Sequence, residues 1–355
     1  MVEAFAENRW MLYGATGFTG TLVAEEAVKR GHSPILAGRN AEKLRSLARR
    51  LGLKYVAFDL DDVNTIARHI ADIDVVYHAA GPFIFTSDSM IHACLATHTH
   101  YLDISGELAV FENTFSYDEA ARRNRIALIS GVGFDVVPTD CLVAYVARHI
   151  SAPSTLEVGI GDFGNGLSAG TFKSTLEILP NGNTVRRDGK LQSAPFSSKE
   201  IPMPGGLTKA LSVPWGDVAT AYRTTGIRNI TAYMALPGPV VTLAQALGPL
   251  FSTLTKNALF RRSLSLIGDR LFTGPTEAKR ETQQVFIWAR ATNPAGESKE
   301  AWLVTPEAYR FTAEIAIEAI ERTLSQQPFG ALTPSLAFGE DFVLAVPGVE
   351  RADTL

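Results

Sequence analysis

Cysteine is scarce in this sequence, since Cys94 and Cys141 are the only two among 355 residues. Both stand in stretches whose pattern predicts buried helix, which excludes a disulfide framework and suits a reducing compartment. Residues 1–10 hold three acidic or amide side chains and no apolar run, so we expect no cleaved secretion signal. The sequence therefore predicts a cytoplasmic location.

An excess of charge of one sign is also missing. The chain carries 33 Lys and Arg residues against 37 Asp and Glu residues, a formal net charge of -4. Without a basic field, nucleic acid is excluded as an expected partner. The composition, with 46% hydrophobic and 20% charged residues, excludes a disordered or fibrous chain. Its length predicts two domains, or one domain with a large excursion.

Two chemical signatures are absent as well. None of the nine tyrosines is followed by a lysine four residues later, which excludes the Tyr-x-x-x-Lys proton donor of short-chain dehydrogenases. No zinc-site spacing connects the potential ligands, so we expect no metal. These potential ligands are His92, Cys94, His98, His100 and Asp103.

The first 150 residues alternate short apolar runs with longer amphipathic stretches, the pattern of a Rossmann-type, doubly wound parallel sheet with crossover helices. The predicted strands are Arg9 to Tyr13, Pro34 to Ala37, Lys54 to Phe58, Val75 to Ala79, His100 to Ile104 and Ala127 to Ser130. The predicted helices are Thr19 to Arg30, Ala41 to Leu51, Val63 to Ala71, Ser87 to Ala96 and Val110 to Arg125.

Beyond residue 150 glycine and proline become frequent, which predicts a second, α+β domain over residues 151–327 for substrate binding or dimerisation. Residues 281–304 predict a hairpin around Asn293-Pro294-Ala295-Gly296. Pro306 to Leu324 predicts a helix capped by Thr305. Residues 328–355, with a helix start at Thr333-Pro334, are expected to pack back on the first domain, residues 1–150.

Residues Asn229 to Thr255 contain no charged side chain. Three prolines, Gln245 and several hydroxyls interrupt the stretch, so a transmembrane span is not expected. A buried core segment or a dimer interface is the favoured interpretation. A lid over an apolar substrate and a surface that rests on a membrane stay open as alternatives.

The strongest functional signal directly follows the first predicted strand and opens the first helix. Its glycines have separate roles: Gly14 permits a tight turn, Gly17 lets the backbone approach a pyrophosphate, and Gly20 lets the helix press on the strand. The phosphates would lie at the helix N-terminus. We therefore predict a dinucleotide site at Gly14, Ala15, Thr16, Gly17, Phe18, Thr19 and Gly20.

The end of the second strand indicates which dinucleotide binds. An NAD site usually has an acidic residue there to hold the ribose hydroxyls, but this sequence reads Gly38-Arg39-Asn40. Arg39 suits a 2′-phosphate, with Asn40 and Lys43 as further donors. NADP is therefore the expected cofactor.

The next strand ends complete the predicted cofactor site, because ligands lie beyond the carboxyl ends of the strands. Asp59 and Leu60 follow the third strand and are expected near the adenine. Ala80, Gly81 and Pro82 follow the fourth and are expected near the nicotinamide ribose.

Several polar residues are candidates for the proton donor, and Tyr101 and Asp135 are the first choices. Tyr101, Asp103 and Glu107 belong to the segment that ends the fifth strand, and Gly170-Thr171-Phe172-Lys173-Ser174 opens a helix in the second domain. Each also has a structural interpretation, because Asp and Ser at strand ends often cap helices.

Taken together, these motifs resemble the saccharopine dehydrogenase-like family of NADP-binding oxidoreductases, and especially its trans-acting enoyl reductase branch. The resemblance implies a Rossmann domain with a substrate domain whose sheet often mediates homodimers. It does not settle the substrate. The residues that carry it are Gly14 to Gly20, Ala37-Gly38-Arg39, Ala80 to Phe83, Tyr101 to Asp103, Gly106-Glu107, Gly133 to Asp135, Pro138 to Asp140, Gly170-Thr171, Trp288, Asn293 to Gly296, Thr305 to Tyr309 and Leu332 to Pro334.

The expected function is an NADPH-dependent reduction of a C=C, C=O or C=N bond in a largely apolar small molecule. The alternative is a sensor or a membrane-associated binding protein that holds NADP without turnover, since a fold is often retained while its chemistry changes.

Overall fold

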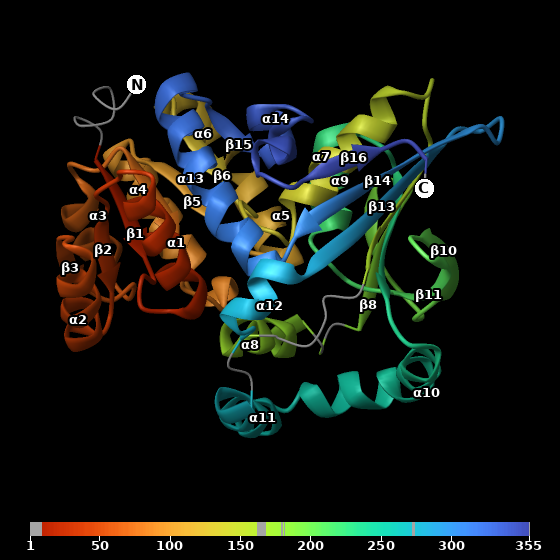
Figure 1. Ribbon diagram of the computed structural model, residues 1–355, viewed down its shortest axis with the longest axis horizontal. Helices are drawn as coiled ribbons and strands as arrows, with labels where there is room; N and C mark the ends of the chain where they lie inside the picture. Colours follow the sequence, from red (N-terminus) through yellow and green to blue (C-terminus); the bar gives the residue numbers. More distant parts are fainter. Residues whose placement is uncertain (1–8, 162–167, 179, 181, 272–273, 355) are drawn as a thin grey trace. The chain divides into compact units, whose positions relative to one another are not determined.

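The computed structural model describes residues 9–161, 168–178, 180, 182–271 and 274–354. The chain forms two compact units (Figure 1). Unit 1 holds residues up to 105, residues 109–134 and residues 309–338. Unit 2 holds residues 106–108, 135–308 and 339–355.

A seven-stranded sheet, parallel throughout, forms the centre of unit 1. Its strand order is β15-β6-β5-β4-β1-β2-β3, so the chain reverses its direction of travel across the sheet between β1 and β4. This confirms the predicted doubly wound sheet. The strands are β1 (Trp10–Tyr13), β2 (Ile35–Gly38), β3 (Tyr55–Ala57), β4 (Val75–His78), β5 (His100–Asp103), β6 (Ala127–Ile129) and β15 (Gly330–Leu332).

Helices cover both faces of this sheet (Figure 1), and its central strands are therefore apolar along their length. All four residues of β1 and of β4 are buried. The helices are α1 (Phe18–Lys29), α2 (Ala41–Leu51), α3 (Val63–Ile70), α4 (Ser87–Thr97), α5 (Leu108–Ser116), α6 (Asp118–Asn124), α13 (Ala308–Gln326) and α14 (Pro334–Phe338). The single helix expected over 110–125 is divided at Tyr117, whose hydroxyl bonds Asp88 at 2.8 Å.

Unit 2 is built on a mixed nine-stranded sheet in which β10-β11-β12-β7-β13-β14-β16 form the main path. Its strands are β7 (Thr155–Ile160), β8 (Asn183–Arg187), β9 (Lys190–Ala194), β10 (Ser198–Met203), β11 (Gly206–Ser212), β12 (Asn229–Ala235), β13 (Gln284–Thr292), β14 (Ser298–Pro306) and β16 (Glu350–Ala352). Its helices are α7 (Val137–Arg148), α8 (Ala169–Ile178), α9 (Asp217–Thr225), α10 (Gly238–Thr255), α11 (Ala258–Leu271) and α12 (Glu277–Thr282).

The units divide the chain at other places than the expected boundaries, 150 and 327. Helix α7 packs on β13 and β14 and so lies in unit 2. Helix α13 and strand β15 lie in unit 1, because β15 extends the parallel sheet beside β6. Strand β16 pairs instead with β14 in unit 2. Residues 328–355, expected to pack on the first domain alone, therefore contribute to both units.

Local expectations in the second half have different outcomes. The hairpin is present as β13 and β14, and Thr333 does begin a helix, since its hydroxyl accepts the Leu336 amide at 3.3 Å. The helix expected from Pro306 begins later, at Ala308. Thr305 is no cap, because it still belongs to β14 and its hydroxyl donates to the Pro306 carbonyl at 3.0 Å.

The uncharged stretch 229–255 forms β12 followed by α10. The buried segment that we favoured is correct for β12 but not for one face of α10, where five large apolar side chains are exposed. Among the described residues, no helix is long and apolar enough to cross a membrane.

Candidate functional site

The glycine loop after β1 forms a tight turn at the point where the sheet reverses its strand order. Gly14 has φ +84°, a conformation that favours glycine. Its amide donates to the Ala37 carbonyl at 2.9 Å, and its own carbonyl accepts the Gly17 amide at 3.0 Å. In doubly wound folds this is the place where ligands bind.

Backbone crowding explains why this loop needs its glycines. A β-carbon on Gly14 would lie 2.7 Å from the Ala79 carbonyl carbon and 2.8 Å from the Ala80 nitrogen. A β-carbon on Gly20 would overlap the Gly14 carbonyl. At Gly14 the loops after β1 and β4 therefore approach each other backbone to backbone, and at Gly20 the start of α1 lies against the backbone of the glycine loop.

The N-terminus of α1 is suited to an anion. Its capping residue, Gly17, offers no side-chain hydrogen bond, and the first turn contains no acidic residue. Phe18, Thr19 and Gly20 open the helix, and the backbone N–H groups and the dipole at a helix N-terminus favour negative charge. The residues between, Ala15 and Thr16, complete the predicted phosphate loop. This cradle fits a pyrophosphate.

The carboxyl ends of β2 and β3 lie close to Tyr13, whose hydroxyl donates to the Phe58 carbonyl at 2.9 Å. Burial raises the pKa of Tyr13, the charge of Asp59 raises it further, and the charge of Arg39 lowers it. Leu60 packs against the core of this unit. Arg39 and Asp59 thus lie at the same edge of the sheet, as expected.

Arg39 is exposed, and within the described part of the chain its guanidinium forms no ion pair with a carboxylate. Asn40 was expected to donate to the 2′-phosphate. Its side-chain oxygen instead accepts the Lys43 amide at 2.9 Å and caps α2. The Lys43 side chain is exposed on the first turn of that helix. Arg39 is therefore the better placed of the three to meet a phosphate.

The loop after β4 is fixed by Thr86, whose hydroxyl donates to the Ala80 carbonyl at 2.8 Å. Gly81 is exposed and Pro82 is half-buried. At the end of β4, His78 is fully buried and its Nε2 lies 3.0 Å from the Thr86 hydroxyl. Burial lowers the pKa of His78 to about 3, so this histidine, which sequence reasoning missed, is neutral.

Tyr101 and Asp103 belong to a buried network. The Tyr101 hydroxyl donates to Asp103 Oδ2 at 2.8 Å, as does the Ser130 hydroxyl. The amides of Ser105 and Gly131 donate to Asp103 Oδ1 at 2.8 and 3.0 Å. Burial raises the pKa of Asp103, and these hydrogen bonds lower it. Because both side chains are fully buried, their contacts favour a structural role.

Asp135, the other candidate proton donor, lies in unit 2. A β-carbon on Gly106 would lie 2.9 Å from its Oδ2, so Gly106 leaves room for this carboxyl. The residue is exposed at the surface, yet desolvation of its carboxyl by the surrounding protein raises its pKa to about 6. Solvent access and a raised pKa are the two properties that a general acid needs near neutral pH.

A second carboxyl near Asp135 was missed by sequence reasoning. Asp217, at the first position of α9, is buried, and its Oδ2 has no hydrogen-bond partner in the described structure. Burial raises its pKa to about 7; hydrogen bonding to Thr139 lowers the pKa, and the charges of Asp135 and Asp140 raise it. No motif marks Asp217, because the cluster forms only when α7 and α9 pack together.

Two of the remaining candidates, Glu107 and Ser174, form a hydrogen bond with each other in unit 2. The Ser174 hydroxyl, on α8, donates to Glu107 Oε1 at 2.9 Å. Residues 166–170 also match the Gly-x-Ser-x-Gly spacing of hydrolases, but Ser168 is buried and its oxygen accepts the Thr171 amide at 3.2 Å. It acts at the start of α8 and not as an exposed nucleophile.

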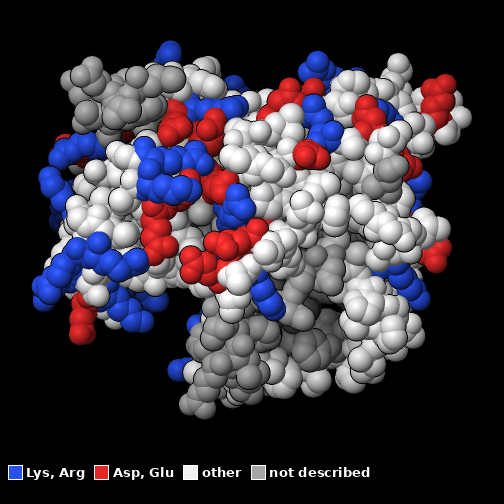
Figure 2. All heavy atoms as spheres, viewed as in Figure 1, with Lys and Arg blue, Asp and Glu red and all other residues white. Residues whose placement is uncertain are grey.

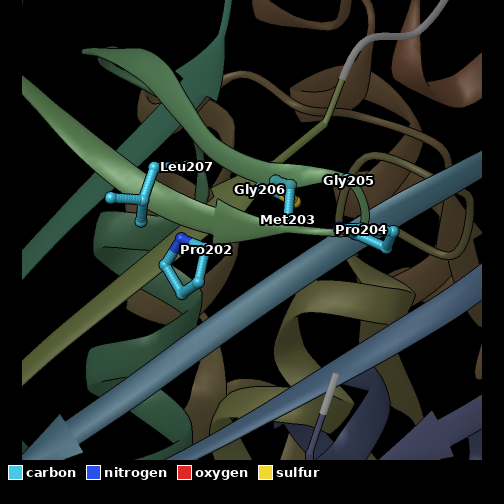
Figure 3. Close-up of a pocket in the computed structure, with 6 residues that line it drawn as sticks. All are labelled: Pro202, Met203, Pro204, Gly205, Gly206 and Leu207. Carbon is cyan, nitrogen blue, oxygen red and sulfur yellow. The ribbon is translucent and has the colours of Figure 1, made fainter.

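Neither of two surface hollows coincides with these sites. One, of about 570 Å³, lies at the β10–β11 turn between Pro202 and Leu207 (Figure 3). The other, of about 320 Å³, contains Asp74 and His100 at the amino ends of β4 and β5, opposite the glycine loop. No group of three metal-ligating side chains is placed to hold an ion in the described parts of the chain.

Comparison with known proteins agrees with this geometry. Residues 14–148 match the family model described as NAD(P)H-binding. A saccharopine dehydrogenase-like oxidoreductase from Bos taurus is 28% identical over 191 residues, 47% of this chain and 44% of that protein. The chain is a relative of the saccharopine dehydrogenase-like oxidoreductases. The similarity to NAD(P)H-binding proteins thus covers the part of the chain that begins with the glycine loop.

Mycobacterial proteins extend the relationship. A putative trans-acting enoyl reductase of Mycobacterium tuberculosis is 30% identical over 182 residues, 48% of this chain and 43% of that protein. These alignments span less than half of the bovine and M. tuberculosis proteins. A trans-acting enoyl reductase of Mycobacterium bovis aligns over 98% of this chain and 97% of its own length at 24% identity.

A solved structure confirms the fold of the whole chain. Apo saccharopine dehydrogenase (L-Glu forming) from Saccharomyces cerevisiae superposes with a TM-score of 0.60 at 14% identity. The match covers 98% of this chain and 100% of the yeast chain. The two chains therefore share the fold, a Rossmann-type sheet with a second mixed-sheet domain.

Proposed function

We propose that this protein is an NADPH-dependent oxidoreductase that reduces a C=C, C=O or C=N bond of a largely apolar small molecule. The observation that carries the proposal is the cradle at the β1–β4 reversal, where two backbones approach too closely for any side chain and an uncapped helix begins. The relationship to oxidoreductases supports it.

NADPH is proposed over NADH because of the end of β2. Arg39 is exposed there, without an ion pair in the described residues, and Gly38 replaces the acidic residue typical of NAD sites. A planar guanidinium binds a phosphate through two hydrogen bonds, whereas a ribose hydroxyl gains little from it.

The chain's own residues would hold the cofactor and supply a proton. The amides of the glycine loop would bind the pyrophosphate and Arg39 the 2′-phosphate. When bound, NADPH supplies the hydride. Asp135 would then donate the proton that completes the reduction, since its pKa of about 6 keeps part of it protonated near neutral pH. Asp217 lies near Asp135, and the charge of Asp135 raises the pKa of Asp217.

The apolar substrate is inferred from residues 229–255, where no charged side chain exists to hold an amino-acid substrate. The experiment is to follow NADPH oxidation by the full chain with enoyl thioesters, ketones and imines. Turnover of an apolar substrate supports the proposal, and turnover of polar amino-acid imines alone contradicts the substrate class. Tight NADPH binding without turnover of any of the three classes would favour the sensor.

The role of Asp135 has its own test in the pH profile. We expect kcat/KM to fall about tenfold per pH unit above the pKa of Asp135, because only the protonated carboxyl donates. Asp135→Asn should lower kcat about a hundredfold or more and remove this dependence, while NADPH affinity is kept. The homodimer remains a prediction, which light scattering of the purified chain tests.

A further inference from the structure

Helix α10 presents a stripe of large apolar side chains to solvent. Val240, Leu243, Leu247, Leu250 and Leu254 are 46–59% exposed. Their spacing of three and four residues places all five on one face of the helix. We name them the α10 stripe. In the view of Figure 2, no charged side chain interrupts the surface over α10.

The opposite face of α10 packs against the rest of unit 2, and this packing determines which way the α10 stripe faces. Val241 is fully buried. The Gln245 side chain donates to the Phe196 carbonyl at 3.1 Å, and a β-carbon on Gly248 would lie 3.0 Å from the Phe196 ring. Residues 241, 245 and 248 are half a turn away from the stripe. The stripe thus faces away from the surface that anchors the helix.

Helix α11 adds a mixed apolar and basic face. Leu259 and Leu266 are 74% and 63% exposed, and Arg262 between them is exposed on the same face. The neighbouring Arg261 anchors the helix instead: its Nη1 donates to the Thr255 carbonyl at 2.6 Å, and its Nε lies 3.3 Å from Glu177 Oε2.

The charge of this region differs in sign from that of the chain. Residues 238–271 contain four basic residues and one acidic residue, a net charge of +3, whereas the whole chain has -4. Lys256 and Arg262 are both exposed. In the described parts of the chain, neither forms an ion pair. The basic charge therefore lies beside the uncharged apolar helix.

We propose that α10 and α11 dock this protein on the surface of a membrane that contains anionic lipids, with α10 lying in the plane of the interface. Exposed leucines on one face, together with flanking lysine and arginine, are the properties of an interfacial helix. The inference depends on these two helices alone and not on the proposed reaction.

A second copy of the chain fits less well. A coiled-coil seam needs three or four heptads, but the α10 stripe extends over 15 residues. The positions beside the stripe, such as Ala246 and Thr253, are uncharged and would not fix a register. Lys256 and Arg262 carry the charge that attracts an anionic surface.

The test is flotation of the full chain with phosphatidylcholine vesicles, prepared with and without phosphatidylserine. We expect flotation with the phosphatidylserine vesicles and its weakening by salt. The double variant Leu243→Gln/Leu250→Gln should lower the bound fraction about tenfold with either vesicle. Lys256→Gln/Arg262→Gln should remove the preference for phosphatidylserine. Leu336→Gln, which changes an exposed leucine of unit 1, is the matched control and should bind as the parent does.

Two results would overturn the proposal. One is the absence of flotation with phosphatidylserine vesicles. The other is a concentration-dependent dimer that the leucine double variant abolishes and vesicles do not compete with, which would assign the stripe to a second copy. All substituted side chains are exposed, and thermal unfolding of each variant checks that the fold is kept.

Discussion

The carbonyl carbon of Ala79 lies 2.7 Å from the point where a β-carbon on Gly14 would stand. This close approach joins the ends of β1 and β4 and shapes the proposed phosphate cradle. Any side chain at position 14 would force the two loops apart, in addition to the cost of a positive φ for a residue other than glycine.

Gly14→Ala should therefore lose stability and cofactor binding together. Its matched control is Gly31→Ala, because Gly31 has the same φ of +84° but nothing within 4 Å of an added β-carbon. We expect Gly31→Ala to lose about 1 kcal/mol of unfolding free energy. Gly14→Ala should lose more and bind NADPH at least about tenfold more weakly. Urea unfolding and fluorescence titration measure both; equal losses and an unchanged Kd would contradict the cradle.

Replacement of Arg39 should change the choice of cofactor. Arg39→Gln removes the guanidinium proposed for the 2′-phosphate, so the Kd for NADPH should rise about tenfold or more, while that for NADH stays the same. Arg49→Gln, at another exposed position of the adjoining helix α2, is the control and should alter neither Kd. If Arg39→Gln leaves NADPH affinity unchanged, another residue must set the preference.

The first domain could be predicted from the sequence because its signals are local. Each buried strand is a short apolar run, and the amphipathic helices between them, such as Ala41–Leu51, have clear caps at Asn40 and Gly52. The role of Gly14 also follows from its position after the first strand.

What the sequence could not predict depends on contacts between distant segments. Asp217 follows no motif, and its pKa is set by burial near Asp135 and Asp140. Thr305 has the residue type of a cap, but pairing with Val285 keeps it in β14. The exposed face of α10 resembles that of a buried helix in composition, because an apolar docking surface and a core face are built from the same residue types.

Tyr101→Phe separates a structural role from a catalytic one. The variant removes the hydroxyl that donates to Asp103 and leaves three other donors to that carboxyl. We expect a loss of about 1 kcal/mol in unfolding free energy with NADPH affinity and kcat nearly unchanged. Tyr55→Phe, at an exposed tyrosine, should cost less than about 0.5 kcal/mol. A large fall in kcat at unchanged stability would instead make Tyr101 the proton donor.

Asp217 should make the stability of the protein depend on pH. Its pKa is about 7 in the folded chain and about 3.9 in the unfolded chain. The folded state therefore binds more protons between these values, so this contribution to stability is complete below about pH 4 and is lost as the pH rises to about 7.

Asp217→Asn keeps the side chain neutral at every pH. Relative to the parent, its Tm should be similar at pH 4 and higher at pH 8, where the parent must hold a buried, ionised carboxylate; each pKa unit corresponds to about 1.4 kcal/mol. Asp72→Asn is the control, because the Asp72 side chain is 85% exposed, and its Tm should follow the parent's at both pH values. Thermal unfolding across this range measures the difference between the curves. Parallel curves for Asp217→Asn and the parent would mean that Asp217 does not titrate between pH 4 and pH 8, which would contradict a folded-state pKa of about 7.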